Sequence, residues 1–191
     1  MKIVCIGDSM TFGYGLKPSE KWVNILNSKG DNQFINRGSN GDTTGGMLAR
    51  FRRDVLDEKP DMVYIMGGPN DYFMGLGIET VKANYTAMVS AAQTNGILPV
   101  VSSHIPQNVG HISERWTSIA DIAGSAKKER EILGWFPAFA KSFGIKYIDT
   151  FHAFEDAVGE RISDYYQEDG LHVNYEGSKV LAEIIAKGLT N

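Results

Sequence analysis

The feature that most constrains the fold is an alternation along the whole chain. Short apolar runs are separated by segments in which apolar residues recur at spacings of three and four. Short runs closed by Gly, Asn, Asp or His are typical of buried strands, and the longer periodic segments are typical of amphipathic helices. Strands that are apolar throughout indicate a parallel sheet covered on both faces. The expected strands are residues 2–6, 33–36, 62–66, 97–102 and 145–148.

This order of elements predicts an α/β fold, a three-layer α/β/α sandwich around a doubly wound five-stranded parallel sheet. Right-handed crossovers restrict the topology, and five strands suggest the order 2-1-3-4-5. The sequence contains no internal repeat, linker or low-complexity tract. We therefore expect residues 1–191 to form a single domain, as is usual for a chain of this length.

Several helix boundaries can be predicted from capping residues. The clearest apolar stripe extends from Ile78 to Ala92, and Gly96 follows it where a helix C-terminus is expected. A helix near the N-terminus is expected to end at Gly30. The last helix should begin at Asn174, a favourable N-cap residue.

Two later segments are harder to assign. Residues 129–143 have helical spacing, with a kink expected at Pro137. Residues 105–125 show no sustained period and contain one proline and two glycines. We expect a long loop or irregular helix there, covering the mouth of a functional site.

Composition and charge exclude several classes of protein. A net charge of −4 is the opposite of what a phosphate-backbone binder shows, so nucleic acid is not an expected partner. No apolar stretch is long enough for a signal-peptide core or a membrane span, so no membrane insertion is expected. The single cysteine, Cys5, cannot form an internal disulfide, which favours a cytoplasmic location.

Four loops beyond the expected strands carry nucleophilic, ionisable or hydrogen-bonding side chains. In a doubly wound sheet these loops gather at one edge, where ligands bind. The loops are Gly7-Asp8-Ser9-Met10, residues 36–43, Gly68-Pro69-Asn70-Asp71 and Asp169-Gly170-Leu171-His172. Each residue alone is commonly a cap or a turn former, but their joint arrival at one edge predicts a site.

These side chains match the requirements of acyl transfer. A serine hydroxyl needs a neighbouring imidazole to accept its proton, and the imidazole needs a carboxylate at its other nitrogen. Ser9, His172 and Asp169 supply these three groups. Donors for an oxyanion are expected from the backbone N–H of Ser9, the backbone N–H of Gly41 and the side-chain amide of Asn70.

The four motifs together resemble the SGNH hydrolase family, the GDSL-type esterases and lipases. They occur in that family's order and span nearly the whole chain. The resemblance implies a flavodoxin-like topology, Ser9 as nucleophile, an Asp169–His172 dyad and an oxyanion hole of Ser9, Gly41 and Asn70. Gly41 is preferred to Gly38 in this alignment. Met10 stands where the family usually has Leu.

The expected function is therefore hydrolysis of carboxylic esters with short acyl or acetyl groups, including acetylated carbohydrate. An acyltransferase or thioesterase with the same triad is an alternative, as is a flavodoxin-like protein that binds phosphate or flavin. No cofactor is expected, and His104, His111 and His152 lack the paired spacing of a metal site. Substrate-binding residues are expected to be Met10, Tyr14, Tyr72 and Phe73.

Overall fold

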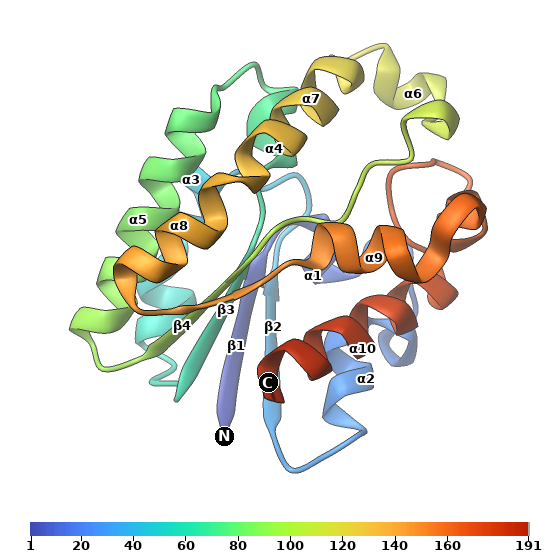
Figure 1. Cartoon of the computed structure of the whole chain (residues 1–191). Coiled ribbons are helices and arrows are strands. Elements are labelled where there is room, and N and C mark those ends of the chain that lie inside the picture. The colour runs from blue at the N-terminus through green and yellow to red at the C-terminus, as the bar shows by residue number, and fades with distance from the viewer. Residues whose placement is uncertain (191) are drawn as a thin grey trace.

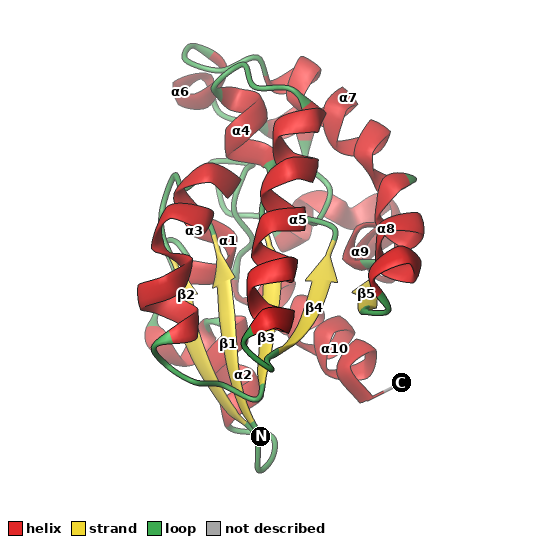
Figure 2. Cartoon of the chain, turned by 90° about the vertical axis from the view of Figure 1, so that its left-hand side faces the viewer, coloured by secondary structure: helices red, strands yellow, loops and turns green. Residues whose placement is uncertain are grey.

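The computed structural model describes residues 1–190 and contains a five-stranded sheet between two layers of helices (Figures 1 and 2). The strand order is β2-β1-β3-β4-β5, and every neighbouring pair is parallel. Both the α/β sandwich and the order 2-1-3-4-5 are thereby confirmed. The strands are β1 (Lys2–Gly7), β2 (Gln33–Gly38), β3 (Met62–Met66), β4 (Leu98–Ser102) and β5 (Lys146–Ile148).

Helices connect the strands and cover both faces of the sheet. The α-helices are α1 (Ser9–Phe12), α2 (Trp22–Asn27), α3 (Thr44–Phe51), α4 (Pro69–Phe73), α5 (Ile78–Thr94), α6 (Glu114–Thr117), α7 (Ile122–Leu133), α8 (Trp135–Phe143), α9 (Thr150–Val158) and α10 (Tyr175–Thr190). Shorter helical turns are η1 (Pro18–Glu20), η2 (Arg52–Leu56, a π-turn), η3 (Val109–His111) and η4 (Gly159–Tyr165). Figure 2 shows α3, α5 and α8 on the face toward the viewer, with α2 and α10 behind the sheet.

Strand β1 shows why the apolar runs are continuous rather than alternating. Ile3 and Cys5 pack against α2, α9 and α10 on one face of the sheet. Val4 and Ile6 pack against α3, α5 and α8 on the other face. Because successive side chains point to opposite faces and both faces are covered, the positions from Ile3 to Ile6 are all apolar.

Two of the predicted helix ends are confirmed and one is wrong. Gly96 follows α5 with a φ of 71°, a left-handed conformation that suits glycine. The side-chain oxygen of Asn174 accepts a hydrogen bond from Gly177 N at 3.1 Å, so Asn174 does cap α10. Helix α2 ends at Asn27, before Gly30, so Gly30 does not end it.

The kink expected at Pro137 is also wrong, because the chain breaks earlier, at Gly134. Helix α7 begins at Ile122, where Asp121 accepts from Gly124 N, and ends at Leu133. A separate helix, α8, starts at Trp135. Pro137 lies in the first turn of α8, where an N–H has no intrahelical acceptor, so the proline costs no hydrogen bond.

Residues 105–121, which we call the cover segment, consist of loops with only the short helices η3 and α6. Figure 1 shows α6 and α7 at the end of the molecule toward which the strands point. The expected irregular region is therefore present at the carboxyl edge of the sheet. Within residues 1–190 every helix is too short or too polar to span a bilayer.

Gly38 is expected to be intolerant of any side chain, because a Cβ there would lie 2.0 Å from Phe12 N and 2.6 Å from Phe12 Cα. Backbone atoms cannot move aside as a flexible side chain can. Gly38→Ala should therefore lower the free energy of unfolding by about 1–3 kcal/mol. The matched control is Gly30→Ala, since a Cβ at Gly30 meets no atom within 4 Å. Urea denaturation of the two variants tests this, and equal midpoints would contradict it.

Candidate functional site

Ser9 is held at the carboxyl end of β1 by the cap of a short helix. Asp8 is the N-cap of α1, and its Oδ1 accepts a hydrogen bond from Met10 N at 2.9 Å. Ser9 is the first residue of α1 and is partly exposed, whereas Asp8 and Met10 are buried. The strand, the cap and the helix together present the Ser9 hydroxyl at the sheet edge, with its backbone N–H among those that the helix leaves unpaired.

Asp169 and His172 form a compact turn before α10. Both the Leu171 and His172 backbone N–H groups donate to Asp169 Oδ1 at 3.0 Å, and Asp169 Oδ2 lies 2.6 Å from His172 Nδ1. Gly170, between them, has a φ of 68°. Partial burial favours a higher pKa for Asp169, but the hydrogen bonds from the His172 ring and from the backbone outweigh it and lower the pKa to about 2.

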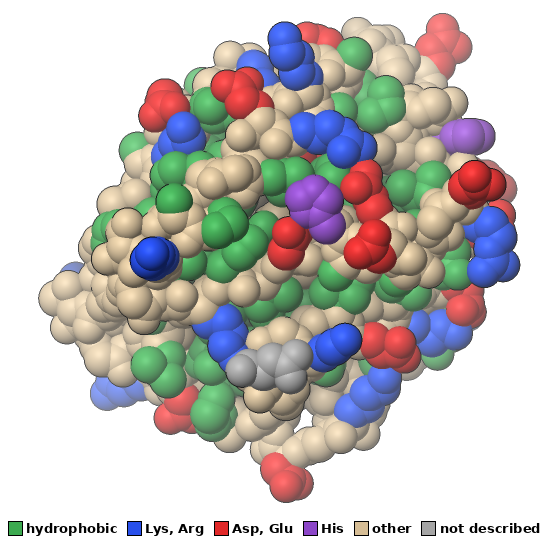
Figure 3. Space-filling view, viewed as in Figure 1, with side chains coloured by type: hydrophobic (Ala, Val, Ile, Leu, Met, Phe, Trp, Pro, Cys, Tyr) green, Lys and Arg blue, Asp and Glu red, His purple; other side chains and the backbone are tan. Residues whose placement is uncertain are grey.

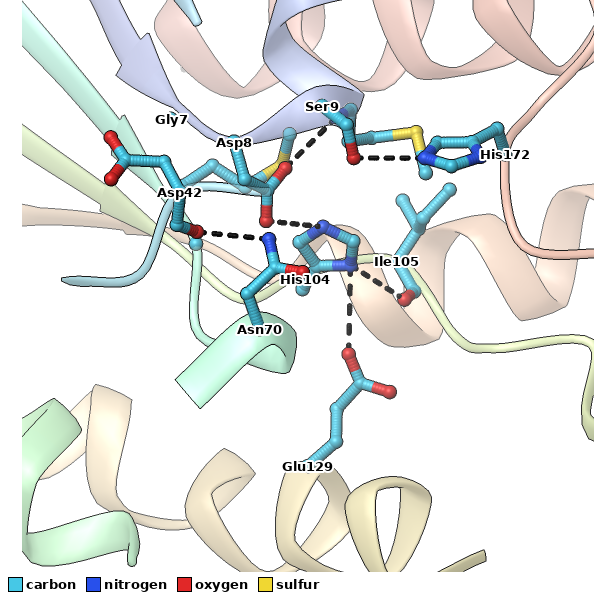
Figure 4. A network of polar contacts seen from close by, with 12 residues as sticks. Gly7, Asp8, Ser9, Asp42, Asn70, His104, Ile105, Glu129 and His172 are labelled. Atoms are coloured by element: carbon cyan, nitrogen blue, oxygen red, sulfur yellow. Dashed lines mark hydrogen bonds and ion pairs between the residues drawn. The ribbon is translucent and has the colours of Figure 1, made fainter. Parts of the chain in front are cut away.

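The structure brings Ser9 to this dyad. Ser9 Oγ lies 2.9 Å from His172 Nε2 (Figure 4). With Nδ1 protonated toward Asp169, the Nε2 lone pair of His172 is directed at the serine hydroxyl. The imidazole is 5% exposed and contacts two aromatic rings, Tyr14 at 4.4 Å and Trp116 at 6.1 Å between centroids. These contacts keep the ring in place.

Asn70 and the loop containing Gly41 lie beside Ser9. Asn70 Nδ2 donates one hydrogen to the Asp42 carbonyl at 2.9 Å, which leaves its second N–H for another acceptor (Figure 4). Gly41 is exposed and has a φ of 71°, so its loop is open to solvent. Gly38 N donates to the Asn36 side chain at 2.9 Å, so the amide of Gly38 is already used. Because Gly38 N is already bonded, the backbone N–H of Gly41 is the better candidate of the two to donate a hydrogen bond to a bound ligand.

Arg50 ties the Gly41–Asp42 loop to the end of β1. Its Nε donates to Asp42 Oδ2 at 2.7 Å and its Nη2 donates to the Gly7 carbonyl at 2.9 Å. A third arm reaches Asp54 at 2.8 Å. Because Gly7 precedes the Asp8–Ser9 turn, one planar guanidinium fixes both segments that flank the serine. Arg50 lies in none of the four sequence motifs.

The pocket beside Ser9 includes two of the four expected substrate-binding side chains. Met10 and Phe73 line it, and Tyr14 stacks on His172 instead. Tyr72, expected at this pocket, is 3% exposed and packs in the core formed with α3, α5 and α8. That expectation is corrected: along α4, Phe73 faces the pocket and Tyr72 faces the core. The cover segment supplies Ile105, Pro106 and Gln107 to the same wall, as expected of it.

Three features were missed or left ambiguous by the sequence. Trp116, which lies in no recognised motif, contacts His172 from the cover segment. His104 and Glu129, assigned no role, form a polar cluster behind Ser9 (Figure 4). The Asp-x-x-His spacing also occurs at Asp149 and His152, whose Nδ1–Oδ2 contact of 2.8 Å compares with 2.6 Å in the 169–172 pair, but the 149–152 pair is exposed. Only its place beside Ser9 distinguishes the 169–172 pair.

The chain is similar in sequence to known esterases and acylhydrolases. The model of the GDSL-like Lipase/Acylhydrolase family matches residues 5–180. The chain is 26% identical to the Arylesterase of Vibrio mimicus over 195 aligned positions, covering 98% of this chain and 88% of that protein. It is 23% identical to Thioesterase 1/protease 1/lysophospholipase L1 of Escherichia coli strain K12, covering 98% and 82%.

A solved structure agrees in fold. The crystal structure of a member of the lipolytic protein G-D-S-L family from Veillonella parvula DSM 2008 superposes with a TM-score of 0.83 at 24% identity, covering 100% of this chain and 99% of that one. The chain therefore belongs to the GDSL-like Lipase/Acylhydrolase family, and it is an enzyme of the esterase and acylhydrolase type. The resemblance to SGNH hydrolases is thereby confirmed.

Replacing Arg50 should weaken the fold because it leaves the largely buried carboxylate of Asp42 without its guanidinium and leaves Asp54 with that of Arg53 alone. Arg50→Met is expected to lower the free energy of unfolding by about 3 kcal/mol at pH 7. Hydrogen bonds from Arg53 and Arg50 lower the pKa of Asp54 to about 2, so the deficit should shrink as the pH falls below 4 and Asp54 loses its charge. Urea denaturation with exposed Arg52→Met as control tests this; equal losses in both variants would contradict it.

Proposed function

We propose that this chain, as one hydrolase domain, is a serine esterase that cleaves carboxylic esters of small molecules through an acyl-enzyme. The observation that carries the proposal is the run of contacts from Ser9 Oγ to His172 Nε2 at 2.9 Å and from His172 Nδ1 to Asp169 Oδ2 at 2.6 Å. A base in hydrogen-bond reach of a hydroxyl, itself oriented by a carboxylate, is the arrangement that activates a serine.

In the proposed reaction, Ser9 Oγ attacks the ester carbonyl while His172 Nε2 accepts the hydroxyl proton. Asp169 holds the ring in the required tautomer and stabilises the imidazolium that forms. The tetrahedral intermediate collapses as His172 returns the proton to the leaving alcohol. Water then attacks the acyl-enzyme by the same route, and carboxylic acid and free Ser9 are released.

The oxyanion is proposed to accept hydrogen bonds from Ser9 N–H, Gly41 N–H and Asn70 Nδ2. The free second hydrogen of Asn70 and the unpaired N–H groups at the start of α1 support this role. Fixed donors of this kind contribute about 10²–10³ each to the rate. Arg50 and the Asp42 carbonyl hold two of the three donors relative to each other.

The shape and surroundings of the pocket support small substrates with short acyl groups, acetylated carbohydrate among them. The apolar side chains of Phe73, Ile105 and Pro106 line the pocket beside Ser9. Acidic and basic side chains are interspersed on the face in Figure 3, which supports a small molecule rather than nucleic acid as the partner. A cytoplasmic location stays a prediction; the one cysteine, Cys5, is free and buried.

Loss of either proposed proton-transfer partner should abolish activity without unfolding the chain. Ser9→Ala and His172→Ala are each expected to lower kcat for p-nitrophenyl acetate roughly 10⁴- to 10⁶-fold. His152→Ala is the matched control, because His152 makes the same type of contact with Asp149 but is exposed and does not line the Ser9 pocket. Steady-state kinetics with circular dichroism tests this. Wild-type rates in either active-site variant would refute the proposal.

A panel of substrates that differ in one part at a time distinguishes an esterase from a thioesterase or an acyltransferase. Acetyl, butyryl and octanoyl p-nitrophenyl esters vary the acyl chain, acetylcholine and acetylthiocholine compare an ester with the matching thioester, and added alcohols serve as competing acceptors. We expect kcat/KM to fall by at least about tenfold from acetyl to octanoyl, since each misplaced contact costs roughly 1–3 kcal/mol. Faster thioester cleavage would favour a thioesterase, and preferential transfer to the alcohol would favour an acyltransferase.

A further inference from the structure

A buried cluster of three ionisable side chains lies directly behind the Ser9 turn. His104, just after β4, is placed between Asp8 at the start of α1 and Glu129 on α7 (Figure 4). Its Nε2 is 3.4 Å from Asp8 Oδ2, and its Nδ1 is 3.6 Å from Glu129 Oε1. Asp8 and Glu129 are 2% and 3% exposed. The esterase mechanism described above uses neither His104 nor Glu129.

The surroundings of His104 identify its protonation state. Its Nδ1 also lies 3.1 Å from the Ile105 carbonyl oxygen, so both ring nitrogens face acceptors. A neutral imidazole donates from only one nitrogen and would direct a lone pair at either the carbonyl or the Asp8 carboxylate. Only the imidazolium offers an N–H to the Ile105 carbonyl while its positive charge faces the Asp8 carboxylate, which lies at ion-pair distance from Nε2 without a hydrogen bond to it. By contrast, His172 faces a carboxylate on one side and a hydroxyl donor on the other, which suits a neutral base.

The charges around His104 agree with this conclusion. Burial alone disfavours a charged ring, but the carboxylates of Asp8 and then Glu129 outweigh burial and raise the pKa of His104 to about 9. Burial raises the pKa of Glu129 to about 7, although His104 opposes that shift. As the pH rises past neutrality, Glu129 therefore ionises and strengthens the hold on the cation.

Other ionisable groups near the cluster do not replace these two carboxylates. Asp71 on α4 interacts with Asp8 only through long-range electrostatics. The same holds for the interaction of Glu129 with Tyr72 on α4 and with Tyr166, and Arg130 follows Glu129 on α7. Across the pocket, which His104 helps to line, the nearest ionisable side chain is His172. The charge on His104 therefore depends mainly on Asp8 and Glu129.

The contact between His104 and Asp8 affects Ser9 because Asp8 precedes Ser9 and caps its helix. One carboxylate oxygen of Asp8 caps α1 by accepting from Met10 N at 2.9 Å, and the other faces His104. Without the imidazolium, Asp8 would be a buried carboxylate held on one side only, free to rotate or to attract water. Either change moves the adjacent Ser9 and its backbone N–H.

We propose that His104 is a positioning residue whose imidazolium, held between Asp8 and Glu129, fixes the Ser9 turn for attack on the ester. It acts through Asp8 and does not touch the reacting atoms. The proposal rests on the proposed esterase function for its kinetic consequence. Its electrostatic basis, a charged His104 in the folded protein, stands apart from activity.

The first experiment measures that charge without requiring catalysis. In Ser9→Ala, the four histidine rings are followed by two-dimensional ¹H–¹³C NMR from pH 5 to pH 10.5, with His104 assigned from its missing signal in a Ser9→Ala/His104→Gln double variant. We expect the His104 ring to be protonated at pH 7.5 and to titrate near pH 9. In a Glu129→Gln background its titration should move to lower pH. A neutral ring at pH 7, or no shift with Glu129→Gln, would overturn the proposal.

The second experiment measures the effect on Ser9. His104→Gln is expected to lower kcat roughly 10- to 100-fold with little change in KM and to remove an alkaline decline in kcat/KM near pH 9. The acidic limb of the profile should be unchanged, because it does not depend on His104; the pKa of Asp169 is about 2, so Asp169 stays ionised there. His152→Gln is the matched control and should keep the wild-type profile.

Thermal denaturation of each variant separates misplacement of Ser9 from loss of folded protein. An unchanged kcat and alkaline decline in His104→Gln, or a loss fully explained by the unfolded fraction, would overturn the positioning role. A wild-type chain that cleaves no ester would refute the esterase proposal, while the NMR titration would still decide the state of His104.

Discussion

The hydrogen bond between Ser9 and His172 joins residues 163 positions apart and depends on the parallel sheet. Every strand ends at the same edge, so a turn after β1 and a turn before α10 arrive at one place. The central positions of β1 and β3 bring the loops with Ser9 and Asn70 side by side. The apolar runs that build a doubly covered sheet therefore also assemble the site.

Two histidines near one pocket differ because of the atoms they face. His172 lies between an acceptor and a donor, so it can hold one proton and receive another. His104 faces acceptors at both nitrogens and is suited to a fixed charge. The same side chain thus serves as a base in one case and as a structural cation in the other, and only the partners differ.

The sequence was sufficient for the sheet and for the residues that lie in contiguous motifs. The strands followed from the continuous apolar runs, and their order was suggested by the count of five strands and by right-handed crossovers. Ser9 and Asn70 lie in short motifs after a strand, and Asp169 and His172 lie in one just before the last helix. Contacts between distant segments have no such local pattern. The break at Gly134, the inward turn of Tyr72 and the approach of Trp116 depend on how helices pack. Spacing alone also could not separate Asp149–His152 from Asp169–His172. In both pairs the aspartate lies three residues before the histidine, and its Oδ2 contacts the histidine Nδ1.

The turn that carries the dyad is joined to the cover segment by its backbone. Ser113 N donates to the Asp169 carbonyl at 3.0 Å, and a Cβ at Gly170 would lie 2.1 Å from the His111 carbonyl oxygen. The cover segment is therefore coupled through its backbone to the turn that holds His172. A displacement of the cover segment near Ser113 would also shift the turn that holds His172, and with it the distance between the imidazole and the Ser9 hydroxyl.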